Sequence, residues 1–167
     1  MSTTRALLLS VAVATTLLAS CAAPTETADY PWYTDAEALY AAADLVVVGT
    51  PDDGERRDVT ISGDGDTMAH QVFTVTVSQV FKGDAVPGAS VAVKQLPGEA
   101  SADDTGLAGG APALLFLQVY DDVPASLLNP AQGWYRIDAA GEPTPLPGNP
   151  VRVSSAQLAG FAESPAS

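Results

Sequence analysis

Thiol and imidazole side chains, which often carry acid–base or metal chemistry, are scarce in this sequence. The 167 residues include one cysteine, Cys21, and one histidine, His70. A single cysteine excludes an internal disulfide and a thiolate zinc site, and a single histidine excludes a multi-histidine metal centre. His70 falls on the wetter face of its expected strand, and no Gly-x-Ser-x-Gly motif accompanies it, so a general-base role is disfavoured.

Carboxylates are the abundant ionisable groups. The chain has 20 acidic and 7 basic side chains and a formal net charge of -13. Asp64 and Asp66 have the Asp-x-Asp spacing of calcium loops, but the glutamate that an EF-hand needs at its twelfth position is missing. Asp and Gly also favour turns for backbone reasons. We therefore expect solvated turns and no cofactor, with Ca²⁺ at these two aspartates as the alternative.

The acidic balance also limits the class of partner. Recognition of phosphate backbones needs clustered Lys and Arg, which this acidic chain lacks, so no nucleic acid partner is expected. The adjacent aspartate pairs at 103–104 and 121–122 fall in expected loops and project to opposite sides of an extended segment. They give no support for a glycosidase-like carboxylate pair.

The first 21 residues have the layout of a bacterial export signal. Arg5 precedes an apolar run over 6–18 that is too short for a durable membrane span. The run ends in Leu18-Ala19-Ser20-Cys21, which resembles the lipobox of bacterial lipoproteins. The resemblance implies cleavage before Cys21, lipidation of that cysteine, and anchoring on the extracytoplasmic face of the cell membrane. The alternative is an ordinary secretory signal cut at an Ala-x-Ala-like site, with Cys21 a bystander.

The sequence divides into three parts on this interpretation. Residues 1–20 are the lipoprotein signal peptide, and residues 21–29 are the lipidated cysteine and a flexible tether of small and polar residues. Residues 30–167 form a single domain, because no internal repeat or second composition boundary is visible.

Hydrophobic periodicity predicts the elements of this domain. Thr34 and Glu37 form a capping box that begins a short N-terminal helix, and Ser154 and Gln157 form a second one that begins a short C-terminal helix. Strands are expected at 45–50, 58–61, 69–81, 91–94, 113–119 and 134–138. The segment 141–150 holds four prolines and is poor strand material.

Two of the expected strands carry most of the fold information. In 69–81, Phe73, Val75, Val77 and Phe81 share one parity, which predicts one buried and one wet face. Segment 113–119 is apolar on both faces and is expected to be central. Strands joined by short turns, with helices at the ends, predict a mainly β fold: a small antiparallel OB-like barrel or a curled sheet.

The ordered set at 43–50, 73–83, 91–93 and 113–117 resembles the OB barrels of netrin-like and tissue-inhibitor-of-metalloproteinase domains, and small bacterial lipoproteins of that pattern. The resemblance implies the fold. The inhibitors use an N-terminal cysteine and several disulfides, and this chain has one cysteine, so inhibition is not carried over.

Aromatic residues are the expected contact points. Trp134, Tyr135, Trp32 and Tyr33 are the side chains best suited to anchor a partner, with core packing as the alternative. We therefore expect a lipid-anchored cell-envelope protein with a non-enzymatic binding domain for an envelope protein or glycan. The alternatives are a carboxylate- or metal-dependent hydrolase that uses the loop aspartates, and a structural envelope protein.

Overall fold

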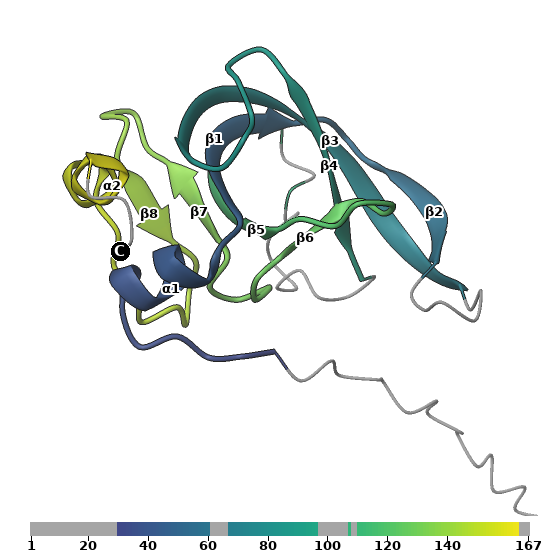
Figure 1. Cartoon of the computed structure of the whole chain (residues 1–167), viewed down its shortest axis with the longest axis horizontal. Helices are drawn as coiled ribbons and strands as arrows, with labels where there is room; N and C mark the ends of the chain where they lie inside the picture. The colour runs from purple at the N-terminus through teal and green to yellow at the C-terminus, as the bar shows by residue number, and fades with distance from the viewer. Residues whose placement is uncertain (1–29, 61–66, 97–106, 108–109, 164–167) are drawn as a thin grey trace, which may run out of the picture.

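The computed structural model describes residues 30–60, 67–96, 107 and 110–163, which form eight strands and two helices (Figure 1). In chain order they are α1 (Ala36–Ala42), β1 (Leu45–Pro51), β2 (Glu55–Thr60), β3 (Thr67–Lys82), β4 (Ser90–Gln95), β5 (Ala113–Gln118), β6 (Ala125–Leu127), β7 (Trp134–Ile137), β8 (Pro143–Pro145) and α2 (Ser155–Glu163). The prediction of a mainly β fold with a short helix near each end is confirmed.

Five strands close into a barrel. β1 pairs with β3 and with β5, β3 pairs with β4, and β5 pairs with β6, all antiparallel. The ring closes through a parallel pairing of β4 with β6 at Val93 and Lys94. Around the ring the strand order is therefore β1-β3-β4-β6-β5, and β5 returns to β1. This is the order of a small OB-like barrel, as predicted.

The remaining strands extend the barrel at its margins. β2 pairs with the first half of β3, and β7 pairs with β5 on the edge that β6 leaves open. β8 pairs with β7 through residues that include Pro143 and Pro145. Prolines are tolerated on an edge strand, so the proline-rich segment adds a short strand where the sequence predicted none. In Figure 1, β7, β8, α1 and α2 lie together on one side of the barrel.

Two hydrophobic cores lie on opposite faces of β5. Leu115 and Leu117 point into the barrel core, which also contains Phe73, Val75 and Trp134. The alternate residues of β5 enter an outer core beneath the two helices, whose buried members are Ala36, Leu39, Ala43, Val46, Leu114, Phe116, Leu128, Tyr135, Val151, Val153 and Leu158. β5 therefore separates two cores, which explains why its sequence is apolar on both faces.

The alternation of β3 breaks near its end. Phe73, Val75 and Val77 face the barrel core as predicted, but Val80 also packs there, and Phe81 packs against the outer core. The pairing with β1 skips one β3 residue at each of two register shifts. Each extra residue is a β-bulge, and a one-residue shift moves the following side chains to the opposite face. The predicted grouping of Phe81 with Val77 is therefore wrong.

The helix caps agree with the sequence at one end of the domain and shift at the other. At α2, Ser154 Oγ accepts from Gln157 N at 3.2 Å and Gln157 Oε1 accepts from Ser154 N at 3.0 Å, which confirms the predicted capping box. At α1, the N-cap is Asp35, whose Oδ1 accepts from Ala38 N at 2.8 Å. Two adjacent residues are good N-caps there, and the carboxylate takes the role predicted for Thr34.

Neither helix in the described ranges is long and apolar enough to cross a membrane.

Candidate binding pocket at one end of the barrel

A pocket of about 710 Å³ opens at the barrel end where β1, β4 and β6 begin and where β3 and β5 finish. Three separate chain segments line it: the start of β1, the β3–β4 turn with the start of β4, and the β5–β6 connection over 119–124. This volume lies in the usual range of sites for small ligands and short peptide segments. We call it the mouth pocket.

The floor of the mouth pocket is apolar. Leu45 and Ala125 belong to the barrel core, and the half-buried Ala85 and Val91 pack against it. The floor is therefore the end of the barrel core, and its partly exposed apolar surface belongs to Ala85 and Val91. A ligand that reached it would remove this apolar surface from water, which favours binding.

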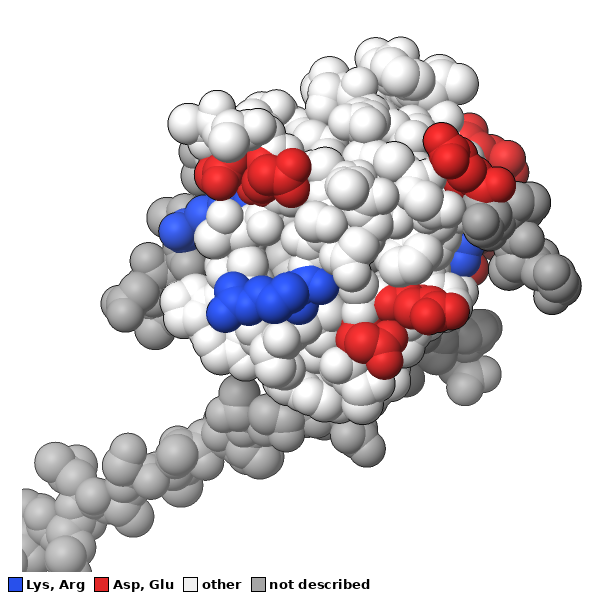
Figure 2. All heavy atoms as spheres, turned by 90° about the vertical axis from the view of Figure 1, so that its left-hand side faces the viewer, with Lys and Arg blue, Asp and Glu red and all other residues white. Residues whose placement is uncertain are grey.

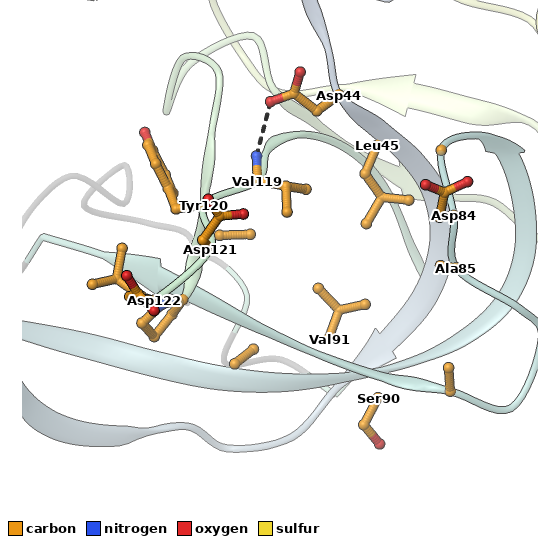
Figure 3. A pocket seen from close by; sticks show the side chains of 16 residues that line it. Asp44, Leu45, Asp84, Ala85, Ser90, Val91, Val119, Tyr120, Asp121 and Asp122 are labelled. Carbon is orange, nitrogen blue, oxygen red and sulfur yellow. Dashed lines mark hydrogen bonds between the residues drawn. The ribbon is translucent and has the colours of Figure 1, made fainter.

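The rim of the mouth pocket is acidic. Asp44, Asp84, Asp121 and Asp122 line it, all four are exposed, and no Lys or Arg is among the described residues that line it. Figure 3 shows Asp84 on one side of the cavity and Asp121 with Asp122 on the other. By contrast, the charged side chains in Figure 2, over the side that carries α2, β7 and β8, form small separate groups. Four carboxylates around one cavity attract cations.

The sequence near the pocket residues contains few cations. Residues 61–66 and 97–106 contain no Lys or Arg. The cation nearest in sequence is Lys82, whose Nζ donates to the carbonyl oxygens of Tyr40 and Ala41 at 3.0 Å each. That ammonium group is therefore directed to the end of α1.

Asp44 has a structural role as well as a place on the rim. Its Oδ2 accepts from Val119 N at 3.0 Å, and its own N–H donates to Leu117 O at 2.9 Å (Figure 3). These bonds tie the residue before β1 to the end of β5. The β5–β6 connection thus leaves the barrel in a fixed direction, with its acidic residues beside the cavity.

The same connection exposes apolar surface. Val119 is 49% exposed and Tyr120 is 39% exposed, and both line the mouth pocket. The hydroxyl of Tyr120 donates to Gln118 Oε1 at 3.2 Å and lies 3.1 Å from Ser126 Oγ. Lys94 Nζ lies 4.5 Å from the centroid of the tyrosine ring. These contacts hold the ring in place, so Tyr120 is a preformed wall of the pocket.

Lys94 is half-buried against that ring. Burial lowers the pKa of its ammonium group below the ordinary value, because desolvation disfavours the charged form. Its position on the outer face of β4, opposite Ser126 of β6, places it outside the set of residues that line the pocket.

The turn that leads into β4 is built from Pro87 and Gly88. Ala89 N donates to Val86 O at 3.0 Å across this turn, and Gly88 has a φ of +87°, which favours glycine. Gly88 N donates to Val77 O at 2.8 Å, and Val77 N donates to Ala89 O at 2.9 Å. Gly88 and Ala89 thus both oppose Val77 of β3. This β-bulge sets which backbone groups of β4 face β3.

His70, the one histidine, is not among the described residues that line this pocket. His70 lies on β3 and is buried, contrary to its predicted place on a wet face; Val72 beside it on that face is buried too. Its Nδ1 lies 2.9 Å from Met68 O. In the described ranges, no group of three or more His, Cys, Asp or Glu side chains could hold a metal ion.

The four aromatic residues predicted as contact points are dispersed. Trp134 is buried in the barrel core and Tyr135 in the outer core, where its ring lies 5.8 Å from Phe116. Burial also raises the pKa of the Tyr135 hydroxyl. The core-packing alternative holds for these two residues. Trp32 is 59% exposed and Tyr33 is half-buried, and neither lines the mouth pocket.

The structure does not describe the other predicted site residues. Cys21, Asp64 and Asp66 lie outside the described residues. The mouth pocket residues were not among the predicted ones, although the pair at 121–122 was considered as a catalytic pair. The available signal was topological: in an antiparallel barrel, a turn after one strand and a connection two strands later meet at one end.

Comparisons with known proteins leave this description to stand on the geometry alone. The chain matches no protein-family model, no curated protein and no solved structure.

Proposed function

We propose that the protein is a lipid-anchored component of a bacterial cell envelope, and that its OB-like barrel binds a positively charged partner in the mouth pocket. The activity is recognition rather than catalysis. One observation carries the proposal: four carboxylates surround an apolar floor, and the part of the lining that the structure describes contains no Lys or Arg.

The anchoring part of the proposal is supported by the lipobox-like Leu18-Ala19-Ser20-Cys21. A tether of about eight residues reaches no further than about 29 Å when extended. The barrel would thus be held close to the membrane, where its acidic charge is repelled by anionic lipid headgroups over a Debye length of about 8 Å. Such a domain faces away from the bilayer, toward other envelope components.

The binding part is supported by how the pocket is composed. A cation with an apolar body satisfies both the rim and the floor, whereas an anion meets four like charges. Tyr120 and Val119 add exposed apolar surface beside the carboxylates, as at the anchor points of many interfaces.

Mass spectrometry of the mature protein tests the anchor. We expect an acylated N-terminal Cys21 and release of the protein from the membrane fraction by Cys21→Ala. A mature N-terminus elsewhere, with an unmodified thiol, would contradict the anchor and leave the pocket untouched.

Crosslinking in intact cells tests the pocket. The double variant Asp121→Asn/Asp122→Asn removes two rim charges, and Asp53→Asn/Asp58→Asn removes two exposed charges outside the pocket. We expect the crosslinked partner to be lost with the first pair, retained with the second, and displaced by excess oligolysine. Equal crosslinking by both variants would favour a structural envelope protein instead.

A further inference from the structure

We infer that the partner enters the mouth pocket as an extended basic polypeptide segment, which adds as a strand to the free edge of β4 at Ser90–Ala92. This inference rests on the proposed function and specifies how the charged partner is held.

The first observation is a gap in the barrel wall. β4 pairs with β3 along Ser90–Gln95, but it pairs with β6 only at Val93 and Lys94. The first three residues of β4 therefore have a strand on one side alone among the described residues, and all three line the mouth pocket. The free stretch of edge faces the cavity.

The sequence explains where the ladder stops. β6 begins at Ala125, directly after Pro124. Proline has no backbone N–H and cannot continue a ladder as a donor. Because Pro124 lines the pocket, the chain is kept from closing the gap with its own backbone at that point.

The free backbone N–H and C=O groups of this edge are directed toward the gap. Val77 N donates to Ala89 O, so Ala89 occupies a hydrogen-bonded position opposite β3. Alternate residues of an antiparallel pair direct their N–H and C=O groups to opposite sides. Val91 therefore bonds to β3, whereas Ser90 and Ala92 direct their backbone groups away from β3, toward the gap.

Other outer edges of the sheet are protected against pairing. β8 carries Pro143 and Pro145, and the outer strand β2 carries Glu55, Arg57 and Asp58. Prolines and charges of this kind are the usual means of blocking strand addition. At the start of β4, the exposed side chains are the small Ser90 and Ala92, which leave the backbone accessible.

The lining of the cavity specifies the occupant. Alternate side chains of an added strand point to opposite faces. One set would reach the apolar floor at Leu45 and Val91, and the other would lie among the rim carboxylates, which Figure 3 shows on both sides of the cavity. The matching segment alternates basic and apolar residues. Main-chain hydrogen bonds supply affinity in this mode, and the side-chain pockets supply specificity.

Synthetic peptides test the inference on the intact protein. The probe is a peptide of about eight residues that alternates Lys and Val, the length of an ordinary strand. In two further peptides the backbone nitrogens are methylated, at all Lys residues in one and at all Val residues in the other. N-methylation keeps charge and side chains but removes the donors along one edge.

We expect the parent peptide to bind, with affinity that falls as salt is raised, and at least one N-methylated peptide to bind about tenfold more weakly or worse. Ser90→Pro should weaken parent binding similarly, while Ser90→Ala should not. Ser90 opposes Thr76 at a position that makes no ladder bond to β3, so proline leaves that ladder intact. Amide protons of Ser90 and Ala92 should become protected from exchange on binding.

Equal binding of all three peptides, unaffected by Ser90→Pro, would overturn strand addition. If Asp121→Asn/Asp122→Asn still abolished that binding, the proposed charge recognition would stand. If a cationic glucosamine oligomer binds and the peptide does not, strand addition is likewise overturned and the proposed charge recognition stands. Binding that is indifferent to the rim aspartates would instead contradict the proposed function itself.

Discussion

The buried amide of Gln132 pairs with the backbone of Tyr33 as a neighbouring strand would. Gln132 Oε1 accepts from Tyr33 N at 2.9 Å, and Gln132 Nε2 donates to Tyr33 O at 2.9 Å. Asn129 adds a bond from its Nδ2 to Pro31 O at 3.0 Å. Gln132 is fully buried, and both polar atoms of its side chain find their hydrogen-bond partners in the backbone of Tyr33. The segment before α1 is thereby fixed to the barrel.

Gln132→Leu is expected to destabilise the domain by about 2–4 kcal/mol, because it leaves the N–H and C=O of Tyr33 without partners in a partly buried site. The measurement is urea unfolding followed by fluorescence. Gln79→Leu changes an exposed glutamine of β3 and should stay within about 0.5 kcal/mol of the parent. An equal loss of unfolding free energy in both variants would show that the hydrogen bonds between Gln132 and Tyr33 contribute no stability of their own.

Asp52 predicts a pH dependence of stability. Its Oδ1 accepts from Thr74 N at 2.8 Å and from Gly54 N at 3.0 Å, and the first of these bonds is the main cause that lowers its pKa below the ordinary 3.8. A lowered folded-state pKa contributes stability above the unfolded value, which is lost as the pH falls through the folded one.

We therefore expect the unfolding free energy to fall less steeply in Asp52→Asn than in the parent as the pH is lowered from about 6 to about 2. The asparagine retains an acceptor oxygen but does not titrate. Asp53→Asn, which removes the neighbouring exposed charge, should follow the parent curve. Coincident curves for the parent and Asp52→Asn would contradict the assignment. The carboxylate is exposed, so solvent screening keeps the effect small.

Lys82 should stabilise the end of α1. Its Nζ donates to the last carbonyls of the helix, at Tyr40 and Ala41, and lies 5.3 Å from the Tyr40 ring centroid. Cations near a helix C-terminus contribute about 0.3–1 kcal/mol. We expect Lys82→Met to cost about 1 kcal/mol in thermal unfolding. Arg57→Met, which removes an exposed cation from β2, is the control and should cost less.

The sequence was informative where local pattern and tertiary role coincide. Ser154 and Gln157 cap α2 because the motif needs only four residues and one turn of helix. β5 could be placed at the centre because both of its faces are apolar. The two bulges of β3 left no such signal, since one inserted residue does not alter composition, and so the side of Phe81 was predicted wrongly.

The site was harder to predict than the fold. Aromatic type alone does not separate an anchor from a core residue, and Trp134 and Tyr135 are both core residues. The mouth pocket joins Asp44, Asp84 and the pair at 121–122, which become neighbours only when β5 pairs with β1 and β6 closes onto β4. Ring closure of this kind depends on pairings between distant segments, and local periodicity does not record it.

Two glycines predict opposite effects of the same substitution. A Cβ at Gly49 would lie 2.5 Å from Val75 Cγ1 and 2.8 Å from Thr76 O, because Gly49 pairs with β3 directly beside a register shift. Gly49→Ala should therefore cost about 1–3 kcal/mol through overpacking. Gly160 lies in α2 with nothing within 4 Å of an added Cβ, and Gly160→Ala should gain about 0.5–1 kcal/mol from helix propensity. Urea unfolding of both variants should place them on opposite sides of the parent. A Gly49→Ala protein as stable as the Gly160→Ala protein would mean that β1 and β3 do not approach as closely as described.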